Sequence, residues 1–236
     1  MRKKLRRLAP RALLWRRGLP TEVAFWERFL RLQGAEWPDD YRQRLTPGAP
    51  ITEPLILERL PLLPSPRLSV LDVGAGPASS LGSALPDRQL ELIAVDPLAE
   101  EYNRLLSALG LAAPVPVARC RGEDVLDMFG RDRFDIAYAR NSLDHTVDPA
   151  ATIRGMLAVI RPGGFVILRH WRNEGQKAGY EDLHQWNLDA IDGDLMIWDE
   201  RRRHTLTDLI PNPDYVHDVA LAGPVVTAVV HRRPPD

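Results

Sequence analysis

Val70-Leu71-Asp72-Val73-Gly74-Ala75-Gly76-Pro77 is an apolar run that ends in a glycine turn, and Ile93-Ala94-Val95-Asp96 is a second apolar run that ends in a carboxylate. The first pattern predicts a buried strand followed by a turn into a helix, and the second predicts a neighbouring strand. Asp96 follows Gly76 by 20 positions (96 − 76 = 20), the spacing that brings an acidic side chain beside a bound ribose in a doubly wound sheet. The first hypothesis is therefore a nucleoside-bearing cofactor.

The glycine turn differs from the G-x-G-x-x-G turn that binds a dinucleotide through its pyrophosphate. Ser79 stands where that pattern has its third glycine, and Asp72 precedes Gly74 by two positions (74 − 72 = 2). A carboxylate at this place would repel a pyrophosphate but attract an ammonium group. The sequence thus disfavours a nicotinamide-dependent oxidoreductase.

The D-x-G-x-G arrangement that begins at Asp72 resembles the first motif of the class I S-adenosylmethionine-dependent methyltransferases. The resemblance covers about residues 68 to 170, because 134–141 is similar to the family's fourth strand with its loop and 160–168 to its L-x-P-G-G turn into the fifth strand. It implies an α/β fold with a doubly wound, mostly parallel, seven-stranded Rossmann-like sheet, and S-adenosyl-L-methionine as the cofactor. Residues 165–198 look like a segment of bacterial methyltransferases whose substrate is unassigned.

The pattern of apolar runs and breakers divides the chain into three parts. These are a basic N-terminal arm at 1–19, a helical cap at 20–66, and a domain at 67–236 that the resemblance identifies as the class I methyltransferase domain, with an insertion at about 170–204. Asp192-Gly193 between two apolar runs predicts a hairpin in this insertion, after the fifth strand. The expected strands are at 68–73, 90–95, 115–119, 134–138, 165–168 and 225–231, and the expected helices are at 21–34, 41–45, 52–60, 78–85, 99–109, 149–160 and 206–210.

The resemblance also implies which residues hold the cofactor. Gly74 and Gly76 let the backbone approach its amino-acid end, and Asp72 orients its ammonium group directly or through water. Asp96 accepts hydrogen bonds from both ribose hydroxyls. An N-cap for the helix after Pro97 is the structural alternative for Asp96.

Two further loops complete the expected cofactor site. Gly122 and Glu123 follow the third strand, where the family holds the adenine amino group, although Arg121 stands where typical members have an aspartate. Asn141 follows the fourth strand, where the family's backbone and polar side chains line the transferred methyl group. The alternative for Asn141 is that it caps a turn.

Methyl transfer needs in-line attack and, where the nucleophile holds a proton, a group that takes it. Our predicted catalytic residues are His145 and His170, because an imidazole titrates near neutral pH and both are expected on loops at the cofactor side. Asp144, Glu174 and His184 are further candidates, and a structural histidine is the alternative for each imidazole. We assign no metal ligands from the sequence; an alternative groups His170, Glu174 and His184 around a divalent cation.

Absent motifs narrow the acceptor. Residues 139–142 lack the Asn/Asp-Pro-Pro-aromatic sequence of enzymes that methylate exocyclic base amines, and Cys120 is not where cytosine-C5 enzymes keep their nucleophile, so we expect no DNA substrate. Lys and Arg (31) nearly balance Asp and Glu (32), which gives RNA no support from overall charge. We expect a small-molecule or glycan acceptor methylated at oxygen. A lone cysteine suits the reducing cytoplasm, where we expect the protein.

The N-terminal segment 1–17 is basic and amphipathic, with eight Lys or Arg residues and no acidic one. Such a segment can contact an anionic membrane surface peripherally or reach an RNA acceptor, and the alternative is a solvated tail. Two further functions therefore stay open. One is an RNA or protein methyltransferase that uses the arm, and the other is a non-catalytic protein that binds the cofactor.

Overall fold

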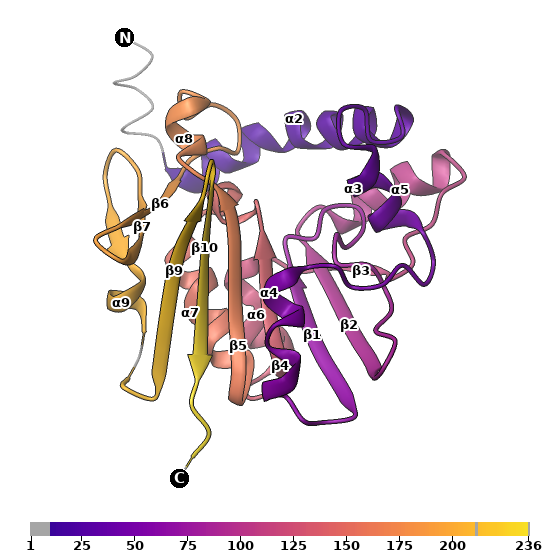
Figure 1. Ribbon diagram of the computed structural model, residues 1–236. Helices are drawn as coiled ribbons and strands as arrows, with labels where there is room; N and C mark the ends of the chain where they lie inside the picture. Colours follow the sequence, from indigo (N-terminus) through magenta and orange to yellow (C-terminus); the bar gives the residue numbers. More distant parts are fainter. Residues whose placement is uncertain (1–9, 211, 236) are drawn as a thin grey trace.

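A seven-stranded sheet forms the centre of the computed structural model, which describes residues 10–210 and 212–235. The strand order is β3-β2-β1-β4-β5-β10-β9 (Figure 1). Neighbouring strands among β1 to β5 pair in parallel, and β10 lies antiparallel between β5 and β9, which confirms the predicted mostly parallel sheet. The bounds are β1 (Arg67–Val73), β2 (Gln89–Asp96), β3 (Val117–Arg119), β4 (Phe134–Arg140), β5 (Ile160–Trp171), β9 (Tyr215–Ala222) and β10 (Val225–Arg232).

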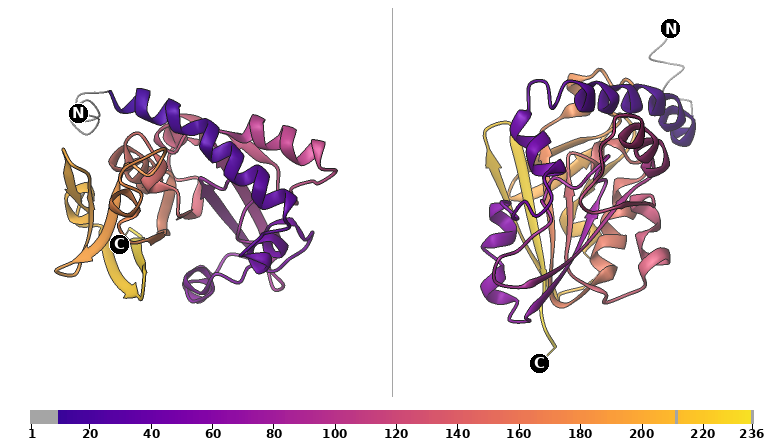
Figure 2. Two further views of the ribbon diagram at one scale, coloured as in Figure 1. Left: turned by 90° about the horizontal axis from the view of Figure 1, so that it is seen from above. Right: turned by 90° about the vertical axis from the view of Figure 1, so that its right-hand side faces the viewer.

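Helices and turns cover both faces of the sheet (Figure 2, right). One face carries α6 (Val125–Phe129) and α7 (Pro149–Val159), and the other carries α4 (Pro54–Leu57) and the 3-10 turn η1 (Leu60–Leu62). The connection from β2 to β3 contains α5 (Ala99–Ala108). Parallel neighbours need crossover connections, and helices with one apolar side fill these connections while they bury the sheet.

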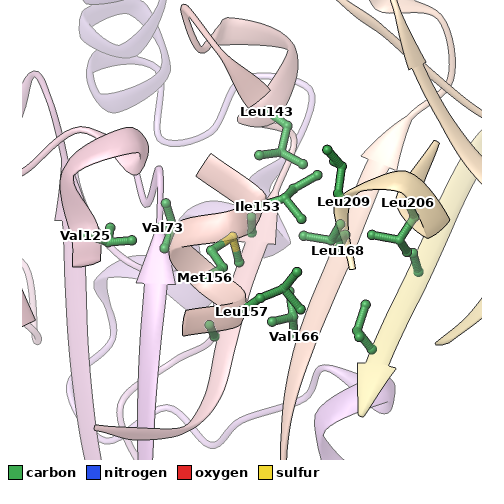
Figure 3. Close-up of a cluster of buried hydrophobic side chains, with 14 of the residues drawn as sticks. Val73, Val125, Leu143, Ile153, Met156, Leu157, Val166, Leu168, Leu206 and Leu209 are labelled. Atoms are coloured by element: carbon green, nitrogen blue, oxygen red, sulfur yellow. The ribbon is translucent and has the colours of Figure 1, made fainter. Parts of the chain in front are cut away.

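The larger part of the core lies between α7 and the sheet (Figure 3). Ile153, Met156 and Leu157 of α7 belong to the same buried cluster as Val166 and Leu168 of β5, and each of the five is at most 1% exposed. Buried positions three or four residues apart place one face of the helix on the strands. Because α7 packs on β4 and β5, it helps to set where the loops after these two strands begin.

The helix expected at 78–85 is absent, because these residues form turns. Gly82 has a φ of +88°, which a right-handed helix does not allow. Arg44 of α3 (Pro38–Leu45) donates a hydrogen bond to the backbone carbonyl of Ala75 at 2.9 Å, at the start of this connection. The prediction was wrong because contacts with the cap stabilise an irregular connection where periodicity alone favoured a helix.

The insertion after β5 forms a second, three-stranded antiparallel sheet. Ile191 pairs with Asp194 across the predicted hairpin turn, so the hairpin is confirmed, whereas β8 of this sheet and β9 of the main sheet were not predicted. The elements of this region are α8 (Glu174–Lys177), β6 (Asn187–Ile191), β7 (Asp194–Trp198), β8 (Arg203–Thr205) and α9 (Leu206–Leu209).

A long helix, α2 (Arg11–Arg31), lies across the end of the sheet at which the parallel strands finish (Figures 1 and 2). It runs continuously through the expected boundary between arm and cap. Arg11 pairs with Asp199 and lies 3.9 Å from the ring centre of Trp186, so the helix begins on the insertion. Residues 1–9 of the arm lie outside the described residues, and its membrane contact stays a prediction. Within the described ranges, no helix has the length and apolar character to cross a bilayer.

Ile153 gives a graded test of the packing between α7 and the sheet. Ile153→Ala should lower the free energy of unfolding by about 2–5 kcal/mol, and Ile153→Val by about 0.5–1.5 kcal/mol, because each removes buried methyl groups and leaves a cavity. Urea unfolding followed by circular dichroism measures both. Equal losses for the two variants would contradict close packing at this position.

Candidate functional site

A cavity of about 560 Å³ lies between α2 and the ends of the parallel strands. Gly74 and Asp96 line it on the side of the sheet, whereas Glu22 and Trp26 line it from α2. Pockets of roughly 300–1,000 Å³ hold one small molecule. Folds of this kind bind their ligands at the carboxyl ends of the strands, so the cavity is where a ligand is expected.

The protein's own side chains pack closely on the glycine turn after β1. Gly74 has a φ of +76°, and a Cβ there would lie 2.3 Å from the Cβ of Ser142. Gly76 has a φ of +67°, and a Cβ there would lie 2.7 Å from Cζ2 of Trp26. Both positions line the cavity, yet both require glycine for the fold itself, because of the backbone conformation and because of these neighbours.

Asp96 ends β2 and binds the glycine turn. Its Oδ2 accepts the backbone N–H of Gly76 at 3.0 Å, and its Oδ1 accepts the N–H of Leu98 at 2.8 Å. Each oxygen retains a second lone pair, and the side chain lines the cavity. Burial raises the pKa of Asp96 to about 7. Asp96 is therefore both a structural acceptor for two amides and a buried acceptor available to a ligand.

Asp72 does not line the cavity. It is 2% exposed and accepts the hydroxyl of Ser79 at 2.7 Å. Burial raises the pKa of Asp72 to about 6, against the hydrogen bond from Ser79 and the charges of Arg44 and Arg140. A direct contact between Asp72 and a cofactor ammonium is therefore not what this structure provides, because the carboxylate faces the turn rather than the cavity. A contact through water stays a prediction.

The loops after β3 and β4 bring Gly122, Glu123 and Asn141 to the cavity. Glu123 Oε1 accepts the backbone N–H of Val147 at 2.9 Å and that of the following residue at 3.0 Å. Asn141 has a φ of +48°, and its Oδ1 accepts the N–H of Trp171 at 2.9 Å. Glu123 and Asn141 therefore each hold a neighbouring loop, and the contacts of all three residues with a cofactor stay predictions.

Asp144, His145 and His184 meet in the wall of the same cavity. Asp144 Oδ2 lies 2.7 Å from His184 Nδ1 and 3.4 Å from His145 Nε2, and these two ring nitrogens are 3.1 Å apart. Burial opposes ionisation of Asp144, but the charge of His145 and the hydrogen bond from His184 outweigh it and lower the pKa of Asp144 to about 2. Burial also opposes protonation of His184, yet the hydrogen bond to Asp144 raises the pKa of His184.

His170, the second predicted base, does not reach the cavity. β5 extends through Trp171, so His170 stands inside a strand, paired with Val226, rather than on a loop. It is 1% exposed, and neither ring nitrogen has a hydrogen-bond partner among residues 10–210 and 212–235. Burial lowers the pKa of His170 to about 4. A base must come within reach of its substrate, so the position of His170 inside the sheet gives its predicted catalytic role no support.

The structure also changes the set of groups that could hold a cation. The alternative from sequence combined His170, Glu174 and His184, but His170 is enclosed in the sheet. The ligand atoms of Asp144, His145 and His184 lie within 4.8 Å of one another instead. This grouping depends on two loops that are about 40 residues apart in the chain, so spacing along the sequence gave no sign of it.

The cap contributes two charged side chains, Glu22 and Arg44, that the sequence did not predict as site residues. Glu22 Oε1 accepts the indole N–H of Trp26 at 2.8 Å, and Glu22 Oε2 lies 3.7 Å from His145 Nδ1. Arg44 lies 4.9 Å from the ring centre of Trp26. The four-residue spacing of Glu22 and Trp26 places them on one helix face, but nothing local indicates that this face meets the glycine turn.

The polar and charged groups that line the cavity suit a nucleoside with a positively charged amino-acid end. Asp96 offers acceptor lone pairs at a buried position, as ribose hydroxyls require. Arg44 and Arg140 also line the cavity and share the single carboxylate of Asp40, at 2.7 and 2.9 Å, so Asp40 offsets only part of their two positive charges. Acidic side chains nevertheless outnumber arginines in the cavity wall. Glu22 adds a carboxylate to the wall. This set favours a cationic ligand over one that carries a pyrophosphate.

Comparison with known proteins gives the family. Residues 43–212 match the family model of the methyltransferase domain, so the chain belongs to this family. An uncharacterized methyltransferase of Mycobacterium tuberculosis is 36% identical over 121 residues, which cover 50% of this chain and 46% of the relative. The matched part is thus less than half of that protein.

One further likeness is in sequence and another is in fold. The chloroplastic tocopherol O-methyltransferase of Arabidopsis thaliana is 29% identical over 127 residues, which cover 52% of this chain and 36% of the relative. The CMeT domain of the citrinin polyketide synthase has a TM-score of 0.51 and 16% sequence identity, over 72% of this chain and 47% of that one. At this identity the structural likeness shows the fold alone.

Gly74 and Gly110 form a matched pair for testing the packing of the glycine turn. Both have a positive φ, but a Cβ at Gly110 would meet no atom within 4 Å. Gly110→Ala should therefore cost only the strain of a left-handed residue, about 1–2 kcal/mol, whereas Gly74→Ala should cost about 1–3 kcal/mol more because Ser142 must move. Urea unfolding of both variants measures the difference, and equal costs would contradict the close contact.

Proposed function

We propose that this protein transfers a methyl group from S-adenosyl-L-methionine to a hydroxyl oxygen of a small-molecule or glycan acceptor. The observation that carries the proposal is a single cavity that joins Asp96, at the end of β2, to the imidazoles of His145 and His184. Membership of the methyltransferase domain family supports the class of reaction. A relative named as an O-methyltransferase supports oxygen as the methylated atom.

In this proposal the sheet side of the cavity binds the cofactor. Asp96 binds the ribose through the lone pairs that its two backbone contacts leave over. Gly122 and Glu123 lie beside the adenine, and Asn141 lies near the transferred methyl. When bound, S-adenosyl-L-methionine supplies a methyl group activated by its sulfonium charge. The cover of α2 limits access of water, which strengthens each of these electrostatic contacts.

The imidazole pair is assigned to the proton of the acceptor. A hydroxyl must lose its proton as it attacks the methyl group. Asp144 is ionised at neutral pH, because its pKa is about 2, and its hydrogen bond and negative charge raise the pKa of His184. The predicted base His145 therefore remains in the proposal, with His184 and Asp144 as its partners.

Aromatic side chains at the cavity support a small acceptor. Phe25, Trp37 and Trp171 line the cavity while 44%, 50% and 42% exposed, respectively. Large apolar side chains that stay this exposed beside a pocket are typical of a binding surface. Flat aromatic faces suit a ring, either of a sugar or of an aromatic compound.

Transfer of labelled methyl groups tests the proposal. The protein is incubated with isotope-labelled S-adenosyl-L-methionine and a fractionated cell extract, and we expect the label in a small-molecule or glycan fraction as an O-methyl group. His145→Ala should lower the rate about 100-fold or more, because a positioned acid or base contributes this much, while binding of S-adenosylhomocysteine stays within about twofold. Label in RNA or protein, or no transfer at all, would contradict the proposal.

The raised pKa of Asp96 predicts that cofactor binding is linked to a proton. In the protein without cofactor, Asp96 has a pKa of about 7. Ribose hydroxyls that donate hydrogen bonds to the ionised carboxylate would lower this pKa. Binding of S-adenosylhomocysteine should then release a proton near pH 7, and affinity should rise from about pH 6 to about pH 8. Calorimetry in buffers of different ionisation enthalpy measures the release.

Asp96→Ala is the control for this linkage. It should weaken binding of S-adenosylhomocysteine more than about tenfold, through loss of two hydrogen bonds to a charged group. The heat with which this variant binds S-adenosylhomocysteine should also be the same in buffers of different ionisation enthalpy. A wild-type heat that is the same in every buffer would remove Asp96 from the ribose site.

A further inference from the structure

We propose that Asp144, His145 and His184 form a binding site for one divalent transition-metal ion. Each offers one ligand atom, and these atoms converge in the wall of the cavity. The inference goes beyond the proposed methyl transfer and does not depend on it, because the three side chains are in place without a cofactor.

The distances between the three ligand atoms match a coordination shell. They are 2.7 Å from Asp144 Oδ2 to His184 Nδ1, 3.1 Å between the two ring nitrogens, and 3.4 Å from Asp144 Oδ2 to His145 Nε2. Metal–nitrogen and metal–oxygen bonds of about 2.1 Å place neighbouring ligand atoms about 3.0 Å apart at right angles and about 3.4 Å apart at tetrahedral angles. The 3.1 and 3.4 Å edges of the triangle match these separations, whereas the 2.7 Å edge between Asp144 and His184 is shorter than both and must open by a few tenths of an ångström when a cation binds.

Hydrogen bonding alone accounts poorly for this triangle. His184 Nδ1 carries at most one proton, yet it faces both Asp144 Oδ2 and His145 Nε2. If that proton binds Asp144, His145 Nε2 is left with the longer contact of 3.4 Å to Asp144 Oδ2. A cation accepts a lone pair from all three atoms at once.

The surroundings of the triangle are those of a cation site. Glu22 Oε2 lies 3.7 Å from His145 Nδ1, the nitrogen that does not face the triangle. Imidazoles that bind metals usually place their second nitrogen against a carboxylate or carbonyl, which fixes the tautomer. Glu174 also lines the cavity and acts on His184, although Lys177 pairs with it at 2.8 Å and offsets part of its charge. The carboxylates therefore favour positive charge at this point.

The ligand types select the class of metal. Two imidazoles and one carboxylate suit Zn²⁺, Fe²⁺ or Co²⁺, whereas Mg²⁺ and Ca²⁺ prefer oxygen ligands throughout. Three protein ligands leave coordination positions open, and because all three residues line the cavity, an oxygen of water or of an acceptor can complete the shell there.

Binding of Co²⁺ to the full chain, stripped with a chelator and dialysed, tests the site. Visible absorption should show one Co²⁺ per chain, which Zn²⁺ displaces. His184→Ala and Asp144→Asn should each weaken binding by at least about 100-fold, since even loss of an outer partner costs about 10–100-fold. Glu22→Gln should weaken Co²⁺ binding about tenfold, because it removes the carboxylate beside the second nitrogen of His145.

His217 provides the matched control, because its Nε2 lies 3.5 Å from Asp194 Oδ1 in an imidazole–carboxylate pair outside the cavity. His217→Ala should bind Co²⁺ within about twofold of wild type. His184 is partly exposed, so His184→Ala carries the test if Asp144→Asn does not fold. Absence of stoichiometric Co²⁺ binding, or equal binding by His184→Ala and His217→Ala, overturns the inference. Binding of S-adenosylhomocysteine by the same stripped protein, measured in parallel, shows whether the proposed function stands without the metal.

Discussion

The carboxylate of Asp96 joins the two strand ends on which the cavity is built. By accepting the N–H of Gly76 and the N–H of Leu98, it links the turn after β1 to the chain that leaves β2. Burial of this group is unfavourable for its charge, which is why its pKa rises to about 7. In return, Asp96 places a buried hydrogen-bond acceptor at the end of β2, in the wall of the cavity.

The cap replaces what would ordinarily be a helix after β1. Arg44 holds the carbonyl of Ala75, and Trp26 packs on Gly76, so two elements from the N-terminal part of the chain shape the connection between β1 and β2. The same helices then form the outer wall of the cavity. The irregular connection and the enclosed site therefore have one cause, which is the packing of α2 and α3 on the glycine turn.

The carboxylate of Asp144 interacts with two imidazoles, His145 from its own loop and His184 from another. Burial alone would keep this carboxyl group neutral, but His145 and His184 lower its pKa to about 2. The carboxylate in turn favours a positive charge between the imidazoles, and either a proton or a metal ion can supply it. This cluster lies in the same cavity as Asp96, so the cavity combines a buried acceptor at one strand end with a charged imidazole–carboxylate group.

The sequence by itself determined the alternation of strands and helices along the chain, the glycine turn, the hairpin of the insertion and the place of Asp96 at the end of a strand, because these depend on local periodicity and on turn residues. The mostly parallel sheet followed from the family resemblance, and the order of its strands came only from the structure. It did not determine the turns at 78–85 or the burial of His170, since the first depends on Arg44 and the second on how far β5 extends. Only the tertiary structure brought Glu22 to His145 and His184 to Asp144. These contacts join segments far apart in the chain, and their geometry is set by the packing of whole helices and strands rather than by any spacing along the sequence.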